Sequence, residues 1–215
     1  MVRGSDGTEA MLTSPLPYNQ DTHDFVMPYD WSPDGQAVLA SFDHPNQHFS
    51  LGLFPLAAAP HAEKAVKIVA SDVRYNFWQG NYSPDGRWIA FVVERRLEPG
   101  LQEVAVMPSS GADASAWFTV TDYGRLADKP RWSPDGRLLY FFLADGAFYD
   151  VWAVRFDPIY GKTNGRPFQV TQFHSPARQI VPDLGINEPS VSATRLILPM
   201  LEKSGSIWML DNVDK

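Results

Sequence analysis

The chain has no cysteine, so disulfide bonds and thiolate metal sites are excluded. It has no apolar run near the roughly 20 residues that a membrane-spanning helix needs. Basic residues are in the minority, because 18 Lys and Arg stand against 25 Asp and Glu, for a net charge of −7. This balance argues against nonspecific nucleic-acid binding, which requires a basic face. We therefore expect a protein with no nucleic-acid partner and no membrane insertion.

Several motifs of catalysis and cofactor binding are also missing. The chain has no G-x-S-x-G nucleophile elbow and no phosphate-binding loop. His44 and His48 are four residues apart in a Pro-containing stretch, and this spacing suits a metal site on a helix better than one on a loop. Residues 1–13 hold one Arg and no apolar core, so they are not expected to be a signal peptide. The sequence predicts no catalytic residue, no metal and no cofactor.

What the chain does have is one short pattern that occurs three times. A Trp or Tyr is followed by Ser-Pro-Asp-Gly and then by an apolar run. The Asp residues of the three copies are Asp34, Asp85 and Asp135, which are spaced by 51 and 50 positions. A fourth copy at residues 188–200 keeps the register but lacks the Pro-Asp-Gly turn. A period near 50 with several short strands per unit is typical of a β-propeller, with one blade per repeat.

We therefore predict an all-β fold, a single β-propeller domain over residues 1–215 with four blades of four antiparallel strands. The predicted blades span about 29–70, 80–121, 129–172 and 186–211, with a further N-terminal strand at 10–13. Strand counting leaves an unmatched outer strand at 10–13 and a missing one after 206–210. Pairing these two segments closes a four-bladed ring. The alternative is an arc of a larger propeller, completed by further sequence, by a partner chain or by a homodimer.

The turn of each copy follows from its residue types. Pro presets φ for the first turn position, Asp bonds its own downstream backbone, and Gly takes the positive φ that other residues avoid. We interpret the acidic residues as turn caps and not as a set of catalytic carboxylates. The predicted structural turn residues are Asp34, Gly35, Asp85, Gly86, Asp135 and Gly136.

Binding residues are sought in the connections between blades, because these gather at one mouth of a propeller channel. Aromatic and Arg residues at such a mouth are typical anchors for a partner or ligand. Trp78 stands out because the other recurring Trp residues occupy strand positions, although plugging of the channel would also explain it. The predicted binding residues are His23, Arg74, Tyr75, Trp78, Tyr123, Arg125, His174 and Arg178.

The repeated pattern W/Y-S-P-D-G-R, as it stands around Asp85 and Asp135, resembles the WD-repeat-like blades of TolB-like β-propeller proteins. The strands at 151–154 and 207–211 and the Leu-Thr pair at 12–13 extend the likeness over nearly the whole chain. Gln36 and the fourth turn depart from the pattern. The resemblance implies a protein-interaction propeller, which in many bacterial members is extracytoplasmic and has six or more blades.

These observations favour a non-catalytic propeller that binds a protein or a small ligand at its channel mouth. One alternative is a carbohydrate-active hydrolase or lyase with an acidic or His site at that mouth. Another is a fragment of a larger multidomain bacterial sensor. An acidic pair at the mouth would favour the enzyme, whereas Arg and aromatic residues there would favour binding. The sequence does not identify the ligand or the compartment, because propellers host many activities.

Overall fold

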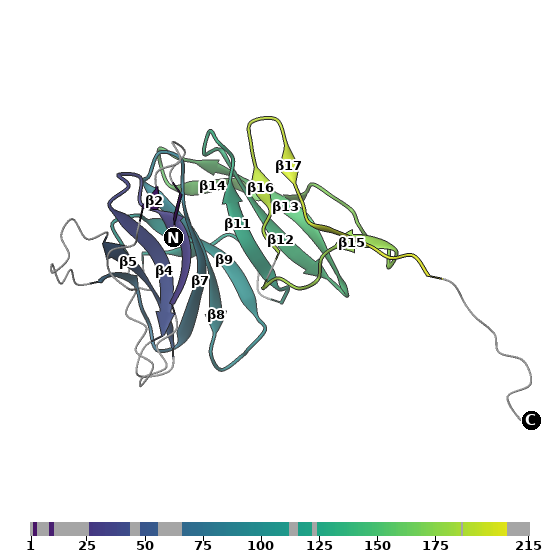
Figure 1. The fold of residues 1–215 in the computed structure, drawn as a ribbon, viewed down its shortest axis with the longest axis horizontal. Coiled ribbons are helices and arrows are strands. Elements are labelled where there is room, and N and C mark those ends of the chain that lie inside the picture. The colour runs from purple at the N-terminus through teal and green to yellow at the C-terminus, as the bar shows by residue number, and fades with distance from the viewer. Residues whose placement is uncertain are drawn as a thin grey trace, which may run out of the picture.

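The computed structural model describes residues 2–3, 9–10, 26–43, 48–55, 66–111, 116–121, 124–185 and 187–205. These residues form antiparallel sheets joined by tight turns, without a helix (Figure 1). The predicted all-β class is therefore confirmed. In this part of the chain there is accordingly no helix long and apolar enough to cross a membrane.

Three four-stranded sheets make up most of the fold, and in each of them strands that follow one another in sequence pair. The first sheet contains β3 (Val26–Trp31), β4 (Ala37–Asp43), β5 (Phe49–Pro55) and β6 (Lys67–Ala70). The second contains β7 (Tyr75–Tyr82), β8 (Trp88–Arg95), β9 (Gln102–Pro108) and β10 (Phe118–Thr119). The third contains β11 (Ala127–Trp132), β12 (Leu138–Asp145), β13 (Phe148–Asp157) and β14 (Lys162–Gln169). This is the strand order of propeller blades.

The fourth unit is built from shorter strands among the residues described. β16 (Ser190–Val191) pairs with β17 (Leu196–Ile197), where the first two strands of a blade were predicted. β15 (Arg178–Ile180) pairs with β18 (Met200–Glu202), although β15 lies between the predicted third and fourth blades.

At the N-terminus, β1 (Val2–Arg3) pairs with β2 (Glu9–Ala10) as a hairpin. Residues 11–13 and 206–210 lie outside the described residues. Closure of the ring by these two segments therefore stays a prediction.

Two strands extend further than their sequences indicated. β7 begins at Tyr75, so Tyr75 and Trp78 lie on an inner strand and not in a connecting loop. A register shift between Trp78 and Asn81 absorbs extra residues, and the strand continues through it to pair with β8. β14 begins at Lys162, after a turn in which the carboxylate of Asp157 accepts hydrogen bonds from the amides of Ile159 and Tyr160.

Each Ser-Pro-Asp-Gly turn is closed by its own side chains. In the second copy, the Ser83 hydroxyl donates to Asp85 Oδ1 at 2.6 Å and accepts from the amide of Trp88 at 3.0 Å. Gly86 has φ +71° and donates its amide to the Ser83 carbonyl at 2.8 Å. The Ser–Asp contact recurs at 2.6 Å in the other two copies.

Hydrogen bonding also shifts the acidity of the exposed turn carboxylates. Donation from the Ser32 hydroxyl, and then from the amide of Gln36, lowers the pKa of Asp34. Ser133 and the amide of Arg137 lower the pKa of Asp135 in the same way.

Successive turns also lie close together. A Cβ atom placed on Gly86 would lie only 2.6 Å from Pro33 of the preceding turn.

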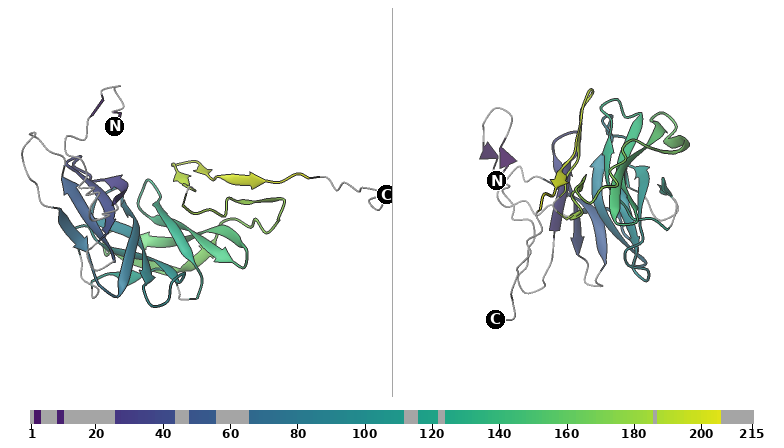
Figure 2. Two further views of the ribbon diagram at one scale, coloured as in Figure 1. Left: turned by 60° about the horizontal axis from the view of Figure 1, so that its bottom comes forward. Right: turned by 90° about the vertical axis from the view of Figure 1, so that its right-hand side faces the viewer.

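Side chains alternate between the two faces along each strand of the second sheet, and both faces are buried. Ile89 and Phe91 of β8 enter a core shared with the first sheet, while Ala90 enters a core shared with the third. A third core joins the third sheet to Ile180 of the fourth unit. The sheets consequently follow one another around an arc, from the first sheet at one end to the fourth unit at the other (Figure 2).

A turn of the third sheet is held against the second sheet. The Pro158 carbonyl accepts hydrogen bonds from Arg87 and from the indole of Trp88, the latter at 3.0 Å. Gly161 has φ +64°, and a Cβ there would lie 1.8 Å from the Trp88 ring. The close approach of this turn to Trp88 therefore requires glycine at position 161 for two reasons: the positive φ, and the lack of room for a side chain.

Gly161→Ala should destabilise the fold more than Gly146→Ala. Gly146 has nearly the same φ, +61°, but a Cβ there would meet nothing within 4 Å. Gly146→Ala should therefore cost about 1 kcal/mol for the left-handed conformation alone. Gly161→Ala adds a clash with Trp88 and should cost about 2–4 kcal/mol. Urea unfolding of the two variants measures the difference, and equal midpoints would show that the turn does not press on Trp88.

Candidate functional site

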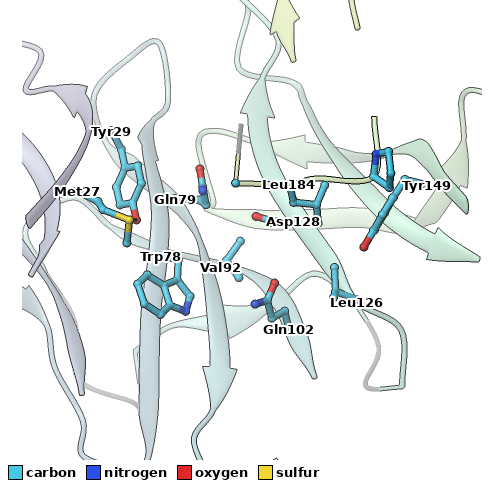
Figure 3. Close-up of a pocket in the computed structure, with 12 residues that line it drawn as sticks. Met27, Tyr29, Trp78, Gln79, Val92, Gln102, Leu126, Asp128, Tyr149 and Leu184 are labelled. Carbon is cyan, nitrogen blue, oxygen red and sulfur yellow. Dashed lines mark hydrogen bonds between the residues drawn. The ribbon is translucent and has the colours of Figure 1, made fainter. Parts of the chain in front are cut away.

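A groove of about 340 Å³ lies on the inner strands of the three sheets. Its walls come from β3, β7, β8, β9, β11 and β13, from the residue that precedes β11, and from the segment that precedes β16. Figure 3 shows Tyr29 and Trp78 on one side, Tyr149 on the other, and Gln79 and Asp128 between them. The groove is therefore mostly aromatic and apolar, with a small number of polar groups, which is the usual composition of a ligand site.

Repetition of the blades explains why these residues meet. Met27, Trp78 and Asp128 each stand five residues before the serine of a turn, Ser32, Ser83 or Ser133. Equivalent positions of successive blades point the same way around the channel, so all three line the groove. This position holds a different residue in each repeat, whereas the turn residues are the same. An alignment of the repeats on their turn serines would therefore have identified it from the sequence.

The neighbouring repeat position holds the backbone in an unusual conformation. Gln79 and Lys129, each four residues before a turn serine, have φ of 56° and 55°. They lie at the register shifts of β7 and β11. A non-glycine residue with positive φ costs on the order of 1 kcal/mol or more, and such residues cluster at functional sites.

Two polar atoms beside the groove have no partner among the residues described. The Trp78 indole nitrogen and the Gln79 amide oxygen are buried and make no hydrogen bond there. Leaving such a group unpaired costs about 1–3 kcal/mol. Groups of this kind occur elsewhere in the described residues too, for example the indole nitrogen of Trp152 and Asn187 Oδ1, so the two beside the groove are compatible with a bound partner but do not by themselves require one.

Among the residues described, Asp128 is the only charged one that lines the groove. Its side chain is buried, and Oδ1 accepts a hydrogen bond from the amide of Lys129 at 2.6 Å. Burial raises the pKa of Asp128 to about 6, against opposing effects of the Lys129 amide and ammonium. Burial also raises the pKa of Tyr29 and that of Tyr149, and the nearby charge of Asp128 adds to both shifts.

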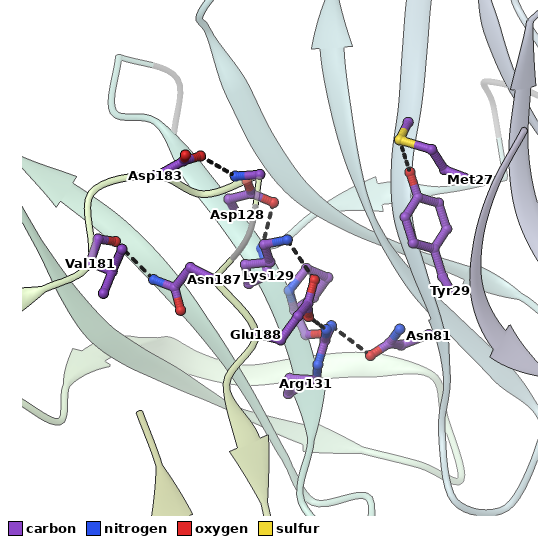
Figure 4. Close-up of polar contacts among 12 residues, drawn as sticks. Met27, Tyr29, Asn81, Asp128, Lys129, Arg131, Val181, Asp183, Asn187 and Glu188 are labelled. Atoms are coloured by element: carbon purple, nitrogen blue, oxygen red, sulfur yellow. Dashed lines mark hydrogen bonds and ion pairs between the residues drawn. The ribbon is translucent and has the colours of Figure 1, made fainter. Parts of the chain in front are cut away.

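A charged network adjoins the groove on β11 and the fourth unit (Figure 4). The carboxylate of Glu188 binds Lys129 Nζ at 2.7 Å and also binds the guanidinium of Arg131. Arg131 donates in addition to Asn81 Oδ1 at 2.8 Å. This network ties the second sheet, the third sheet and the fourth unit together across the inner strands.

Trp78 is the one predicted binding residue, among those described, that lines the groove. It stacks on Phe49 with ring centroids 4.1 Å apart. Arg74 pairs with Asp72 at 2.6 Å on the surface, and the ring of Tyr75 packs against Trp117.

The other predicted residues lie apart from the groove. Arg125 donates to the Ala144 carbonyl and lies over Trp152, while Arg178 pairs with Glu202 at 3.3 Å. His174 Nε2 lies 2.7 Å from the fully buried carboxylate of Asp150, which also accepts from the Phe173 amide. Asp150 thereby fixes the segment that enters the fourth unit. The remaining predicted residues, His23 and Tyr123, lie outside the described residues.

The histidine pair considered as a metal site is only half visible. His44 lies outside the described residues, and His48 is buried with Nε2 3.1 Å from the Ser71 hydroxyl. Within the described ranges, no three His, Asp or Glu side chains are grouped so that they could hold a metal ion.

Asp128 should make stability depend on pH. An unfolded Asp titrates near about 3.9. Because the pKa of the folded carboxyl is about 6, the folded state binds its proton more tightly. The contribution of Asp128 is therefore greatest below the unfolded pKa and is lost as pH rises through about 6. Asp128→Asn should raise stability at neutral pH by on the order of 2 kcal/mol and flatten this dependence.

Urea midpoints at about pH 4 and about pH 7.5 measure the effect of pH on stability. Glu98→Gln, which removes an exposed carboxylate from a surface pair, is the control and should leave the pH dependence unchanged. If the stability of Asp128→Asn depended on pH as steeply as that of the wild type, another group would be responsible for the pH dependence.

No protein-family model matches the chain, and no curated protein matches it by sequence. Solved structures do resemble it. A puromycin-hydrolyzing peptidase of Mycobacterium tuberculosis is 19% identical, with TM-score 0.54, over 71% of this chain and 22% of its own. TolB from Acinetobacter baumannii is 18% identical, with TM-score 0.54, over 84% and 41% of the two chains. Prolyl oligopeptidase B from Galerina marginata is 15% identical, with TM-score 0.53, over 82% and 27%.

These likenesses establish the fold, and the predicted propeller is confirmed as a TolB-like β-propeller fold. Sequence identities of 15–19% support a shared fold and no conclusion about function. The chain spans less than half the length of each of these three proteins.

Proposed function

We propose that this chain is a non-catalytic propeller module that binds a segment of a partner protein in the groove on its inner strands. The observation that carries the proposal is the pair of unpartnered polar atoms, on Trp78 and Gln79, beside an aromatic groove. Both atoms are buried, so a bound segment with a carbonyl and an amide can pair with the indole N–H and the amide oxygen once these two side chains turn toward it. A polypeptide backbone supplies both groups at every residue.

The character of the site favours binding over chemistry. Most of the groove is built on paired strands, so these walls are held in place by the sheets, while residues 182–185 close it from a connecting segment. Backbone strain at Gln79 and Lys129 is maintained beside it, as at preorganised sites. The structural neighbours include TolB and two proteins named as peptidases, and the two peptidase names are compatible with a polypeptide as the partner.

A second candidate is an acid-dependent hydrolase or lyase acting on carbohydrate. It is favoured by Asp128, because a carboxyl whose pKa is about 6 suits a general acid. The other nearby carboxylate, Glu188, is bound by two cations and is poorly placed to act as a second catalytic group. Turnover of chromogenic glycosides that disappears in Asp128→Asn would replace the binding proposal by this one.

Trp78→Phe tests the binding proposal, because it keeps an aromatic ring on Phe49 and removes the indole N–H. Peptides are first selected from a random library on the wild-type protein. The variant should bind them about three- to tenfold more weakly, as expected for the loss of one hydrogen bond. Fluorescence anisotropy with labelled peptides measures the affinities.

Trp31→Phe is the matched control, since Trp31 is 39% exposed and does not line the groove. It should leave affinity unchanged. Urea midpoints of both variants separate loss of binding from loss of folding. A library that yields no binder, or binders that are indifferent to Trp78→Phe, would contradict the proposed site.

A further inference from the structure

We infer that the groove recognises a cationic group, an ammonium or guanidinium, which Asp128 binds and the rings of Tyr29, Trp78 and Tyr149 surround. This inference rests on the proposed binding function and specifies what the groove selects. In the part of the chain that the structure describes, three aromatic side chains and one carboxylate line the groove, with no Lys, Arg or His beside them. Aromatic rings attract cations through their negative faces, and a carboxylate adds a charge-assisted hydrogen bond.

One oxygen of the Asp128 carboxylate can accept a further hydrogen bond. Oδ1 accepts from the Lys129 amide, and no hydrogen bond reaches Oδ2 from the residues described. Tyr29 and Tyr149 line the same groove as Asp128. The carboxylate is buried and poorly solvated, and a cation that paired with it would recover the interaction that burial removed.

The cations closest to Asp128 are already paired. Lys129 is buried, and its ammonium binds Glu188; Arg131 binds Glu188 and Asn81. Lys129 and Arg131 line a separate small cavity with Pro189 and Val191, on the side of β11 that faces β16. Neither side chain lines the groove. The groove is thus open to an external cation, while the internal cations hold the fourth unit in place.

A lysine side chain and a free amine share this chemistry, and matched probes distinguish them. The first pair is N-acetyl-lysine methylamide and N-acetyl-norleucine methylamide, which differ by the ammonium group. The second is tetramethylammonium and tert-butanol. The lysine compound should bind at least about tenfold tighter than the norleucine compound at neutral pH. Tetramethylammonium should compete with it if the cation suffices, and should fail if the polypeptide backbone is also needed.

Asp128→Asn should abolish this preference, because it keeps the acceptor for the Lys129 amide and removes the charge. Glu98→Gln, on an exposed carboxylate that does not line the groove, should retain it. Lowering the pH through about 6 neutralises the Asp128 carboxyl, so it should weaken the preference of the wild type for the lysine compound. Asp128→Asn, which has no such preference at neutral pH, should not change.

Equal binding of the lysine and norleucine compounds, binding of neither, or a preference that survives Asp128→Asn would overturn the inference. The library peptides separate it from the proposed function. Peptides that depend on Trp78 but contain no Lys, Arg or free amine would leave the binding function standing and refute the cation. Peptides that are enriched in Lys or Arg and bind more weakly to Asp128→Asn would support both.

Discussion

The fold depends on the burial of both faces of the middle sheet. An antiparallel sheet commonly keeps one face in water, but β8 and β9 are apolar on both sides. Such a sheet is stable only when another sheet covers each face. The first and third sheets do this, and the third is covered in turn by the short strands of the fourth unit. The arc of sheets follows from this requirement.

The turns fix how the sheets are set against one another. Each Ser-Pro-Asp-Gly turn is closed by its own Ser and Asp, and the Pro33 ring of one turn lies against Gly86 of the next. Trp88 adds a second link, through Pro158 and Gly161 of the third sheet. Because successive blades are held in equivalent positions, the residues five places before each turn serine gather at one place.

The groove is formed at a cost to stability that the rest of the fold offsets. Gln79 and Lys129 hold positive φ, Trp78 and Gln79 leave polar atoms unpaired, and Asp128 is buried as a carboxylate. The register shifts of β7 and β11 account for the positive φ values, and the Lys129 amide satisfies one oxygen of Asp128. A protein that tolerates all of them at one site, on rigid strands, fits a site where a ligand supplies the missing contacts.

Local chemistry made much of the fold predictable from sequence. The spacing of Asp34, Asp85 and Asp135 determined the repeat, and two-sided apolar runs determined buried strands between the turns. The site was predicted less well. Among the predicted binding residues that are described, Trp78 lines the groove, and its other lining residues Tyr29, Gln79, Asp128 and Tyr149 were not among those predicted. Their roles arise from strands distant in sequence, from bulges that set φ at Gln79, and from the burial that raises the pKa of Asp128. A turn is decided by neighbouring residues, whereas burial and convergence exist only once the sheets have packed together.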